Sequence, residues 1–223
     1  MGRPFGLMKV AVVIPCYNES MTLAPVVAGA IAAADVDVFV VDDGSTDGSD
    51  IIARDNGATV VPTKGREGYD GAIETGLRHA HSQGYHAVIT IDADGEHDPA
   101  LVADFTKALT TGTDLVSGIR PAPQRLAEWV VCWYCKRTFG INDILCGMKG
   151  YSRPVLDAYF DQGQPNLVNT WPAVVWASAG NSVEQINVTG TPRTDTPRYS
   201  SLMRANWRII QLLPKFARQA RTR

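Results

Sequence analysis

Four carboxylates lie within seven residues of the chain, in the stretch VITIDADGEHDP at residues 88–99. Asp92, Asp94, Glu96 and Asp98 follow an apolar run that is typical of a buried strand. Carboxylates this close repel one another, so they need a positive partner. An Asp-x-Asp turn offers two hard oxygen ligands, which suit Mg²⁺ or Mn²⁺ together with a substrate phosphate. We therefore predict a divalent cation at Asp92 and Asp94.

Two more polar clusters follow apolar runs, PCYNES at residues 15–20 and VDDGSTD at 41–47. The carboxyl ends of parallel strands meet at one edge of a sheet, so all three clusters are expected to share one site. The glycine-rich GREGYDGA at 65–72 opens a predicted helix, where backbone N–H groups and Arg66 are able to meet a phosphate. His97 is expected to be solvated, with a contact to the metal or a phosphate as the alternative.

The first 120 residues alternate predicted strands and helices, which indicates an α/β fold with an open, mostly parallel sheet flanked by helices. The strands are expected at 10–15, 36–41, 59–62, 87–91 and 115–117, and the helices at about 20–33, 47–56, 69–82 and 99–109. Asp98 and Pro99 suit the cap and first turn of the last of these helices.

The second half is less regular. Its predicted elements are an amphipathic helix at 125–140, a strand at 181–188, a polar loop at 189–201 and a helical pattern at 202–219 that Pro214 interrupts. We expect a single domain over residues 1–201, with a substrate-binding half at 1–120 and a second half at 121–201, followed by a basic amphipathic helix at 202–223.

The charge is uneven. Residues 1–200 carry a net charge of −8, whereas residues 201–223 hold six Arg or Lys and no acid. We predict that this tail meets an anionic membrane surface, with Trp207, Ile210 and Phe216 in the interface and Pro214 bending the helix. No apolar run is long enough to span a membrane, and no nucleic-acid partner is expected. The four cysteines are expected to be reduced structural thiols in a cytoplasmic protein that is peripheral on the cytoplasmic face of the membrane.

The chain lacks a Gly-x-x-x-x-Gly-Lys-Ser/Thr phosphate loop and a Gly-x-Gly-x-x-Gly after its first strand. Instead, VVIPCYNES, VDDGSTDGS, REGYDGAIETGL, ITIDADGEHDP and DILCGMKGYSR resemble the ordered motifs of family 2 glycosyltransferases with the GT-A (Rossmann-like) fold. Asp143 with CGMKGYSR is most similar to the polyprenyl-phosphate glycosyltransferases of the dolichol-phosphate mannose synthase type. The resemblance implies inverting, metal-dependent transfer of a sugar from a GDP- or UDP-linked donor.

The resemblance also implies roles for single residues. It implies that Asp92 and Asp94 bind the metal and the diphosphate, and that Asp94 is a catalytic residue. It also implies a set of nucleotide-binding residues, to which we add Arg66 and Asp92: Pro15, Tyr17, Glu19, Asp42 and Asp43. PRTDTPRYSS stands where lipid-phosphate relatives show an Arg and then Gly-x-Ser-Lys, so Arg193 and Arg198 are approximate matches.

Residues of the second half of the domain indicate which class of acceptor the enzyme uses. Transfer to a hydroxyl needs a general base, but residues 166–180 contain no acid where hydroxyl-transferring relatives carry Glu-Asp. A phosphate acceptor is already ionised and needs cations instead. We therefore expect a lipid phosphate such as polyprenyl phosphate, bound by Arg120, Lys149, Arg193 and Arg198. The alternative is a hydroxyl acceptor with Asp143 as base. A non-catalytic nucleotide-sugar binder and a nucleotidyltransferase are rival classes.

Overall fold

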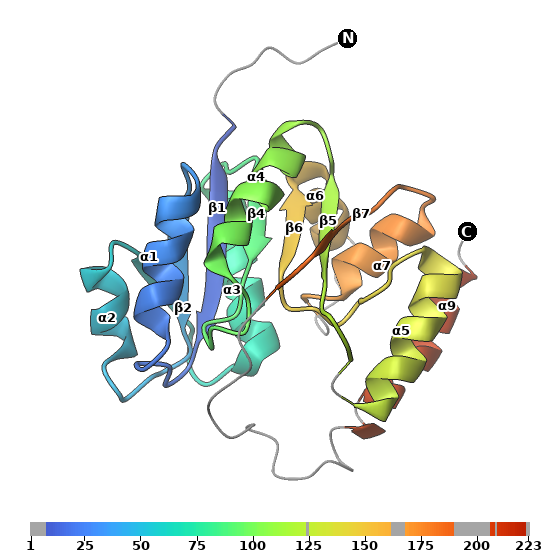
Figure 1. Cartoon of the computed structure of the whole chain (residues 1–223), viewed down its shortest axis with the longest axis horizontal. Coiled ribbons are helices and arrows are strands. Elements are labelled where there is room, and N and C mark those ends of the chain that lie inside the picture. The colour runs from blue at the N-terminus through green and yellow to red at the C-terminus, as the bar shows by residue number, and fades with distance from the viewer. Residues whose placement is uncertain (1–7, 124, 162–167, 190–205, 208, 222–223) are drawn as a thin grey trace.

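The computed structural model describes residues 8–123, 125–161, 168–189, 206–207 and 209–221 (Figure 1). Its strands are β1 (Val10–Cys16), β2 (Asp37–Asp42), β3 (Thr59–Pro62), β4 (Ala87–Thr90), β5 (Leu115–Ile119), β6 (Lys149–Ser152) and β7 (Glu184–Asn187). Its α-helices are α1 (Leu23–Ala33), α2 (Ser49–Asp55), α3 (Gly68–Ser82), α4 (Val102–Thr110), α5 (Leu126–Phe139), α6 (Arg153–Asp161), α7 (Trp171–Ser178) and α9 (Leu213–Ala220), and a 3₁₀ turn covers Pro99–Leu101.

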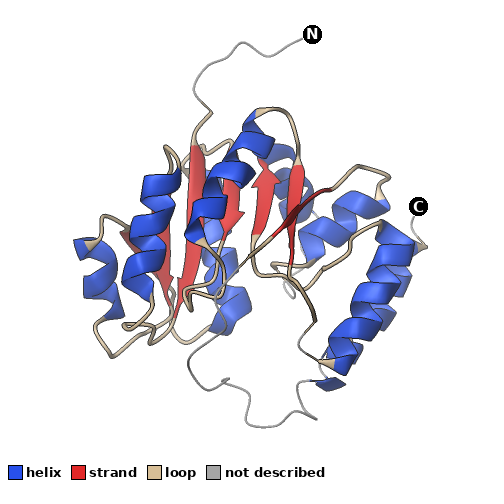
Figure 2. Ribbon diagram, viewed as in Figure 1, coloured by secondary structure: helices blue, strands red, loops and turns tan. Residues whose placement is uncertain are grey.

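The strands of the described chain form one sheet in the order β3-β2-β1-β4-β6-β5-β7 (Figure 2). β1 is parallel to β2 and β4, β2 is parallel to β3, and β5 is parallel to β7. β6 is antiparallel to both of its neighbours, β4 and β5. The carboxyl ends of β2, β1 and β4 therefore lie side by side at one edge, as the sequence predicted for the three polar clusters.

Helices cover both faces of the sheet. One apolar core joins the sheet to α1, α2 and α4, and a second joins the opposite face to α3, α5, α6 and α7. α3 lies unusually close to the strands because Gly76 has no side chain. A Cβ added at Gly76 would lie 2.4 Å from a methyl carbon of Val13 and 2.8 Å from one of Val41. This close packing fixes the start of α3 at the edge that carries the polar clusters.

The α/β fold with a mostly parallel sheet is confirmed, and each predicted strand and helix of the first half is present within a few residues. Asp98 accepts a hydrogen bond from the N–H of Ala100 at 2.9 Å, as expected of a cap. β6, α6 and α7 were not predicted. The predicted loop at 189–201 and the boundary between residues 201 and 202 lie almost wholly outside the described residues. All four cysteines are free and buried, as expected.

The C-terminal segment packs on the domain. α9 contacts α5 and α7, and the Phe216 side chain is fully buried, with its ring stacked 6.4 Å from that of Trp171. The prediction that Phe216 enters a membrane is therefore wrong, because the protein core already covers it. Pro214 stands in the first turn of α9 and does not bend a continuous helix. None of the described helices has the length and apolar character that crossing a bilayer requires.

Candidate functional site

The loops after β1 and β2 are tied to each other by hydrogen bonds. The N–H of Asn18 donates to Oγ of Ser45 at 3.0 Å, and the N–H of Thr46 donates to Oδ1 of Asn18 at 2.8 Å. The N–H of Ser20 donates to a carboxylate oxygen of Asp47 at 2.9 Å. Asn18 has a φ of 51°, a left-handed conformation that asparagine tolerates better than most residues. The first two polar clusters therefore form one structural unit.

Asp43 connects this unit to α3. Its carboxylate accepts hydrogen bonds from the N–H groups of Glu67 and Gly68 at 2.7 and 2.8 Å and from the Thr63 hydroxyl at 2.9 Å. A carboxylate at this position satisfies N–H groups at the start of the helix and suits its dipole. Asp42, one residue earlier, accepts a backbone hydrogen bond at 3.0 Å within its own turn. Asp43 is 3% exposed, so the structure places it beneath the surface of the site.

Tyr17 and Arg66 face each other across the same edge. The guanidinium carbon of Arg66 lies 3.5 Å from the centre of the Tyr17 ring, a cation–π contact. Pro15 is buried in β1, and Glu19 is held by a 2.9 Å hydrogen bond from its N–H to Oγ of Ser49. The structure thus brings the predicted nucleotide-binding residues to one edge, with an aromatic ring and a cation among them.

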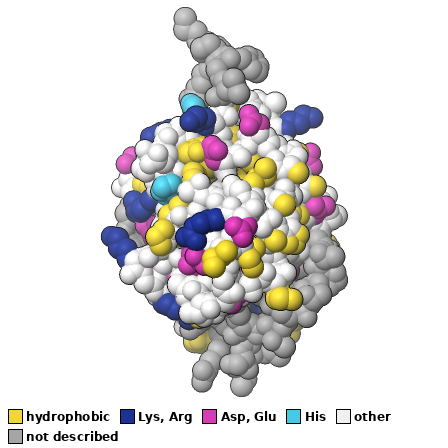
Figure 3. Space-filling view, turned by 90° about the vertical axis from the view of Figure 1, so that its left-hand side faces the viewer, with side chains coloured by type: hydrophobic (Ala, Val, Ile, Leu, Met, Phe, Trp, Pro, Cys, Tyr) yellow, Lys and Arg dark blue, Asp and Glu magenta, His cyan; other side chains and the backbone are white. Residues whose placement is uncertain are grey.

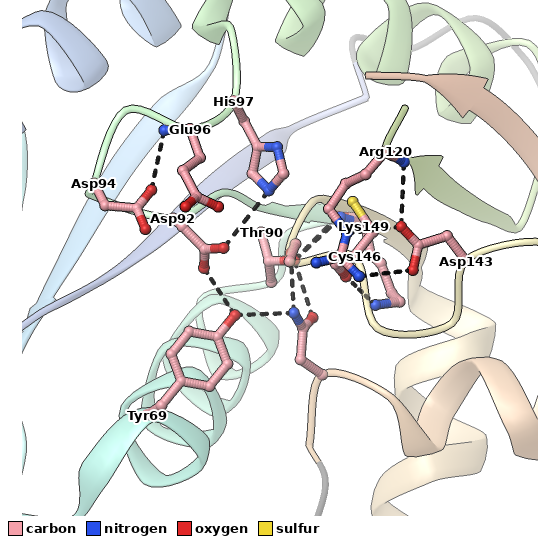
Figure 4. Close-up of polar contacts among 12 residues, drawn as sticks. Tyr69, Thr90, Asp92, Asp94, Glu96, His97, Arg120, Asp143, Cys146 and Lys149 are labelled. Carbon is pink, nitrogen blue, oxygen red and sulfur yellow. Dashed lines mark hydrogen bonds and ion pairs between the residues drawn. The ribbon is translucent and has the colours of Figure 1, made fainter. Parts of the chain in front are cut away.

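Asp92 lies just beyond the end of β4, where two groups contact its carboxylate (Figure 4). The Tyr69 hydroxyl donates to Oδ1 at 2.8 Å, and Nε2 of His97 lies 3.6 Å from Oδ2. Burial alone would raise the pKa of Asp92, but His97 and Tyr69 hold that pKa below its ordinary value. His97 is 3% exposed, so the expectation of a solvated histidine is wrong. The buried imidazole is a polar neighbour of the Asp92 carboxylate.

Gly147 leaves the space that Asp92 occupies. A Cβ added at Gly147 would lie 2.0 Å from Oδ2 of Asp92 and 2.7 Å from its Cγ. No residue other than glycine fits at position 147 unless it or Asp92 moves. Gly147, the first glycine of the CGMKGYSR motif, therefore allows Asp92, the predicted metal ligand, to take its position.

Asn169 connects Tyr69 and Gly147, which contact Asp92, to strands β4 and β6 of the sheet. Its side-chain N–H groups donate to the Tyr69 hydroxyl at 3.1 Å and to the carbonyl of Gly147 at 2.9 Å. Its Oδ1 accepts from the hydroxyls of Thr90 and Tyr151 at 3.1 and 2.9 Å. Asn169 is 5% exposed and comes from the segment in which the sequence showed no acid. An amide, which both donates and accepts, satisfies this network in a way that a carboxylate would not.

Asp94 and Glu96 complete the acidic turn. Oδ1 of Asp94 accepts the N–H of Glu96 at 3.0 Å, and Figure 4 shows the carboxylates of Asp92, Asp94 and Glu96 gathered near one another. Within the described residues, no group of three or more potential ligands closes around one point. The hard oxygen donors of Asp92 and Asp94 fit Mg²⁺ or Mn²⁺, which is commonly held by one or two carboxylates together with substrate phosphates. The residues present therefore fit the predicted metal.

Arg120 and Asp143 form a two-pronged ion pair at the end of β5. Nε of Arg120 donates to Oδ2 at 2.7 Å and an amino group donates to Oδ1 at 3.0 Å. Oδ2 also accepts the backbone N–H of Arg120 at 3.1 Å, and Oδ1 accepts that of Leu145 at 3.3 Å. Burial opposes ionisation of Asp143, but Arg120 outweighs it and lowers the pKa of the carboxyl. Both oxygens are occupied and weakly basic, which is the opposite of what a general base requires.

Of the other predicted acceptor contacts, the structure describes only Lys149. The Lys149 side chain is fully buried, its Nζ donates to the carbonyl of Cys146, and burial lowers its pKa. Its charge acts from beneath the site, near Asp143 and Asp92, and direct contact with an acceptor stays a prediction. Arg193 and Arg198 lie outside the described residues.

Residues 11–129, more than half of the chain, match the family described as glycosyl transferase family 2. The chain belongs to this family. An undecaprenyl-phosphate mannosyltransferase of Micrococcus luteus is 32% identical over 170 residues, which cover 68% of this chain and 69% of that protein. A polyprenol monophosphomannose synthase of Mycolicibacterium smegmatis is 29% identical over 211 residues, 83% of this chain and 78% of that protein.

Solved structures agree on the fold of this family 2 glycosyltransferase. A crystal structure of glucosyl-3-phosphoglycerate synthase from Mycobacterium tuberculosis, in complex with Mn²⁺, UDP and glucosyl-3-phosphoglycerate, matches with a TM-score of 0.76. The match has 21% identity and covers 94% of this chain and 80% of that one. The predicted GT-A fold and glycosyltransferase class are confirmed, and the rival class of nucleotidyltransferases is set aside. The relatives also support the predicted resemblance to polyprenyl-phosphate glycosyltransferases.

Sequence reasoning missed Tyr69, Gly147 and Asn169. Tyr69 stood inside the quoted GREGYDGA turn, and Gly147 stood inside CGMKGYSR, so their motifs drew attention without revealing their contact with Asp92. Asn169 had no comparable sequence pattern, because its partners are 18 to 100 residues away along the chain.

Proposed function

We propose that this family 2 glycosyltransferase moves a sugar from a nucleotide sugar to a lipid phosphate such as polyprenyl phosphate, with inversion and with Mg²⁺ or Mn²⁺. In the reaction, the bond between the sugar's anomeric carbon and the donor diphosphate breaks, and a bond from that carbon to an acceptor phosphate oxygen forms. The nucleoside diphosphate leaves. The names of the bacterial relatives support a polyprenyl-phosphate acceptor.

The observation that carries the proposal is the ion pair of Arg120 with Asp143. A hydroxyl acceptor would need a base with a reachable oxygen and a pKa near neutrality. Asp143 was the candidate, but Arg120 holds both of its oxygens and lowers its pKa. A phosphate monoester needs no such base, because it is largely ionised at neutral pH. In this account, Asp143 is a positioning residue that holds the Arg120 guanidinium, which is 15% exposed, at the end of β5.

The donor half supplies the other requirements. Tyr17 and Arg66 give the nucleotide an aromatic surface and a cation at the end of β1. Asp92 and Asp94 would hold the metal, which when bound would supply positive charge to offset that of the diphosphate leaving group. Tyr69 and Gly147 keep Asp92 where it can do this. Asp43 anchors the start of α3 and thereby sets the position of Tyr69.

A lipid-borne acceptor also implies work at a bilayer surface. We propose a peripheral enzyme on the cytoplasmic face of the membrane, where nucleotide sugars are available. The exposed cations Lys215, Arg218 and Arg221 of the C-terminal segment suit anionic headgroups.

The test is an acceptor comparison. The purified chain is incubated with Mn²⁺, a panel of GDP- and UDP-linked sugars, and either a polyprenyl phosphate or the corresponding polyprenol. We expect nucleoside diphosphate release and a glycosylated lipid only with the phosphate, and loss of both with chelator or with Asp94→Asn. Transfer to the alcohol would favour the hydroxyl-acceptor alternative. Binding of a nucleotide sugar without turnover on any acceptor would favour the non-catalytic binder.

A further inference from the structure

The outward face of α5 is apolar. Leu126, Trp129, Val130 and Trp133 recur at the spacing that places side chains on one side of a helix. Within the part of the chain that the structure describes, their exposed fractions are 83%, 61%, 48% and 58%. These four are the outer stripe of α5. Two tryptophans left in water on a single helix call for a partner.

The inward face of the same helix is apolar as well. Val131, Cys135 and Phe139 are buried against the core that includes α7 and α9. The sequence predicted an amphipathic helix, but the outer side of α5 is apolar from Leu126 to Trp133, and the exposed charges of the helix are confined to its last turn. A helical stretch that is apolar on both its inner and outer sides is normally covered on both. The protein covers only the inner side of α5.

The apolar surface continues beyond α5. The N–H of Ala127 approaches the side-chain oxygen of Asn206 at 3.4 Å, which places the neighbouring Trp207 beside the first turn of α5. Trp207 is 64% exposed, and Ile210 in the same segment is 40% exposed. The side of the molecule that carries α1 and α2 is different, because Figure 3 shows charges of both signs mixed among its apolar side chains.

The charges around the outer stripe indicate what covers it. Lys136 and Arg137 are exposed in the last turn of α5, and the Arg137 guanidinium carbon lies 5.4 Å from the centre of the Trp133 ring. The one acid of the helix, Glu128, is 3% exposed and is paired with Arg120 and Arg125. Every exposed side chain on α5 is therefore apolar or basic.

An anionic bilayer matches this combination. Tryptophan prefers the boundary between headgroups and acyl chains, and Lys and Arg are attracted by anionic headgroups. A second copy of the chain fits less well, because a two-fold interface would set the same basic residues against each other. We propose that the outer stripe of α5, with Trp207 and Ile210 beside it, is the surface by which this protein docks on an anionic membrane.

This proposal rests on the proposed function only for the reason to dock, since a lipid phosphate must be reached at the bilayer. Geometry connects the two, because Glu128 in the first turn of α5 pairs with Arg120 at 3.3 Å. The docking helix and the proposed acceptor-binding arginine are therefore joined directly. Docking would bring the acceptor edge of the site close to the lipid headgroups.

The test compares full-length variants in sedimentation with vesicles of phosphatidylcholine, with and without phosphatidylglycerol. We expect the unchanged protein to bind the anionic vesicles, more weakly in high salt. Trp129→Glu/Trp133→Glu should reduce binding about tenfold or more. Ile51→Glu is the matched control, because Ile51 on α2 is as exposed as Trp133 at 58%, and it should bind normally. Trp133→Ser gives a milder change that also removes the aromatic anchor.

A second readout separates docking from catalysis. The double variant should turn over a water-soluble, short-chain acceptor phosphate at the normal rate while losing turnover of long-chain acceptor in vesicles. Loss of both would locate the fault in the fold or the active site, and docking would then be judged on Trp133→Ser. Equal vesicle binding by all variants overturns the proposal. So does a dimer, seen by light scattering, that the double variant dissolves.

Discussion

Gly147→Ala tests whether the position of Asp92 governs turnover. The added Cβ would lie 2.0 Å from Oδ2 of Asp92, whereas real Cβ contacts are essentially never shorter than 3.0 Å. Asp92 or Gly147 must therefore shift by about 1 Å, and we expect this shift to disturb the 2.8 Å hydrogen bond between Asp92 and Tyr69. A displacement of about 1 Å in a positioned group costs about 100-fold in rate, equivalent to about 2.7 kcal/mol.

The assay is nucleoside diphosphate release at varied Mn²⁺ concentration, with a thermal melt to check folding. Gly150→Ala is the matched control. Its Cβ would also be crowded, at 2.9 Å, but by the methyl end of Leu109, which is flexible and remote from Asp92. We expect this control to lose stability without a large change in the metal requirement.

A double-mutant cycle isolates the cause. If Gly147→Ala acts through Asp92, it should cost less than about twofold when added to Asp92→Ala, because the carboxylate it displaces is already gone. Full activity of Gly147→Ala with an unchanged metal requirement would refute the reasoning. An equal loss in both backgrounds would show that the alanine acts elsewhere.

Three further outcomes are expected. Tyr69→Phe should weaken apparent Mn²⁺ affinity about fivefold with an unchanged melting temperature, by loss of one hydrogen bond to a charged group; unchanged affinity would contradict this. The pKa of Asp143 is lower in the folded protein than in the unfolded chain, so its ion pair stabilises the fold fully above about pH 4 and is lost as the pH falls through the lower, folded-state pKa. Asp143→Asn should therefore flatten the fall of melting temperature at acid pH, and an unchanged fall would count against this reasoning. Phe216→Ala should cost about 3–5 kcal/mol of unfolding free energy in urea, whereas a surface role would leave it unchanged.

The expected loss at Phe216 also bears on the tail. Deletion of residues 202–223 would remove a core aromatic ring along with the basic residues, so it would not test membrane binding alone. Charge reversal of exposed Lys215 and Arg218 leaves the core intact and is the cleaner comparison.

The first half of the fold was predictable because each strand is a run of Val and Ile followed by a turn. β1 is buried along its whole length, so its sequence is apolar on both faces and easily recognised. β6 reads Lys-Gly-Tyr-Ser and has no such pattern. Lys149 is fully buried there although lysine is a charged residue, so its type did not indicate a buried strand. Only the pairing with β4 and β5 makes it a strand.

The position of the candidate site was predictable to the same extent. Asp92 and Asp94 drew attention because close carboxylates after a buried strand repel one another, and the parallel pairing of β4 with β1 places that strand end beside the other polar clusters. The ion pair of Asp143 with Arg120 joins residues 23 positions apart, and the hydrogen bond of Asn169 with Tyr69 joins residues 100 positions apart. No local sequence pattern indicates contacts at such separations. The two exposed tryptophans of α5 were visible in the sequence, but helical periodicity does not tell which apolar face the core covers.

The most direct measurement is the identity of the atom that receives the sugar. The lipid product formed from a nucleotide sugar and polyprenyl phosphate is analysed by ³¹P nuclear magnetic resonance and by mass spectrometry. The account predicts a sugar phosphodiester, with the anomeric carbon joined to a phosphate oxygen and inverted relative to the donor. A product in which the sugar is joined to a hydroxyl oxygen, or one with retained configuration, would contradict it.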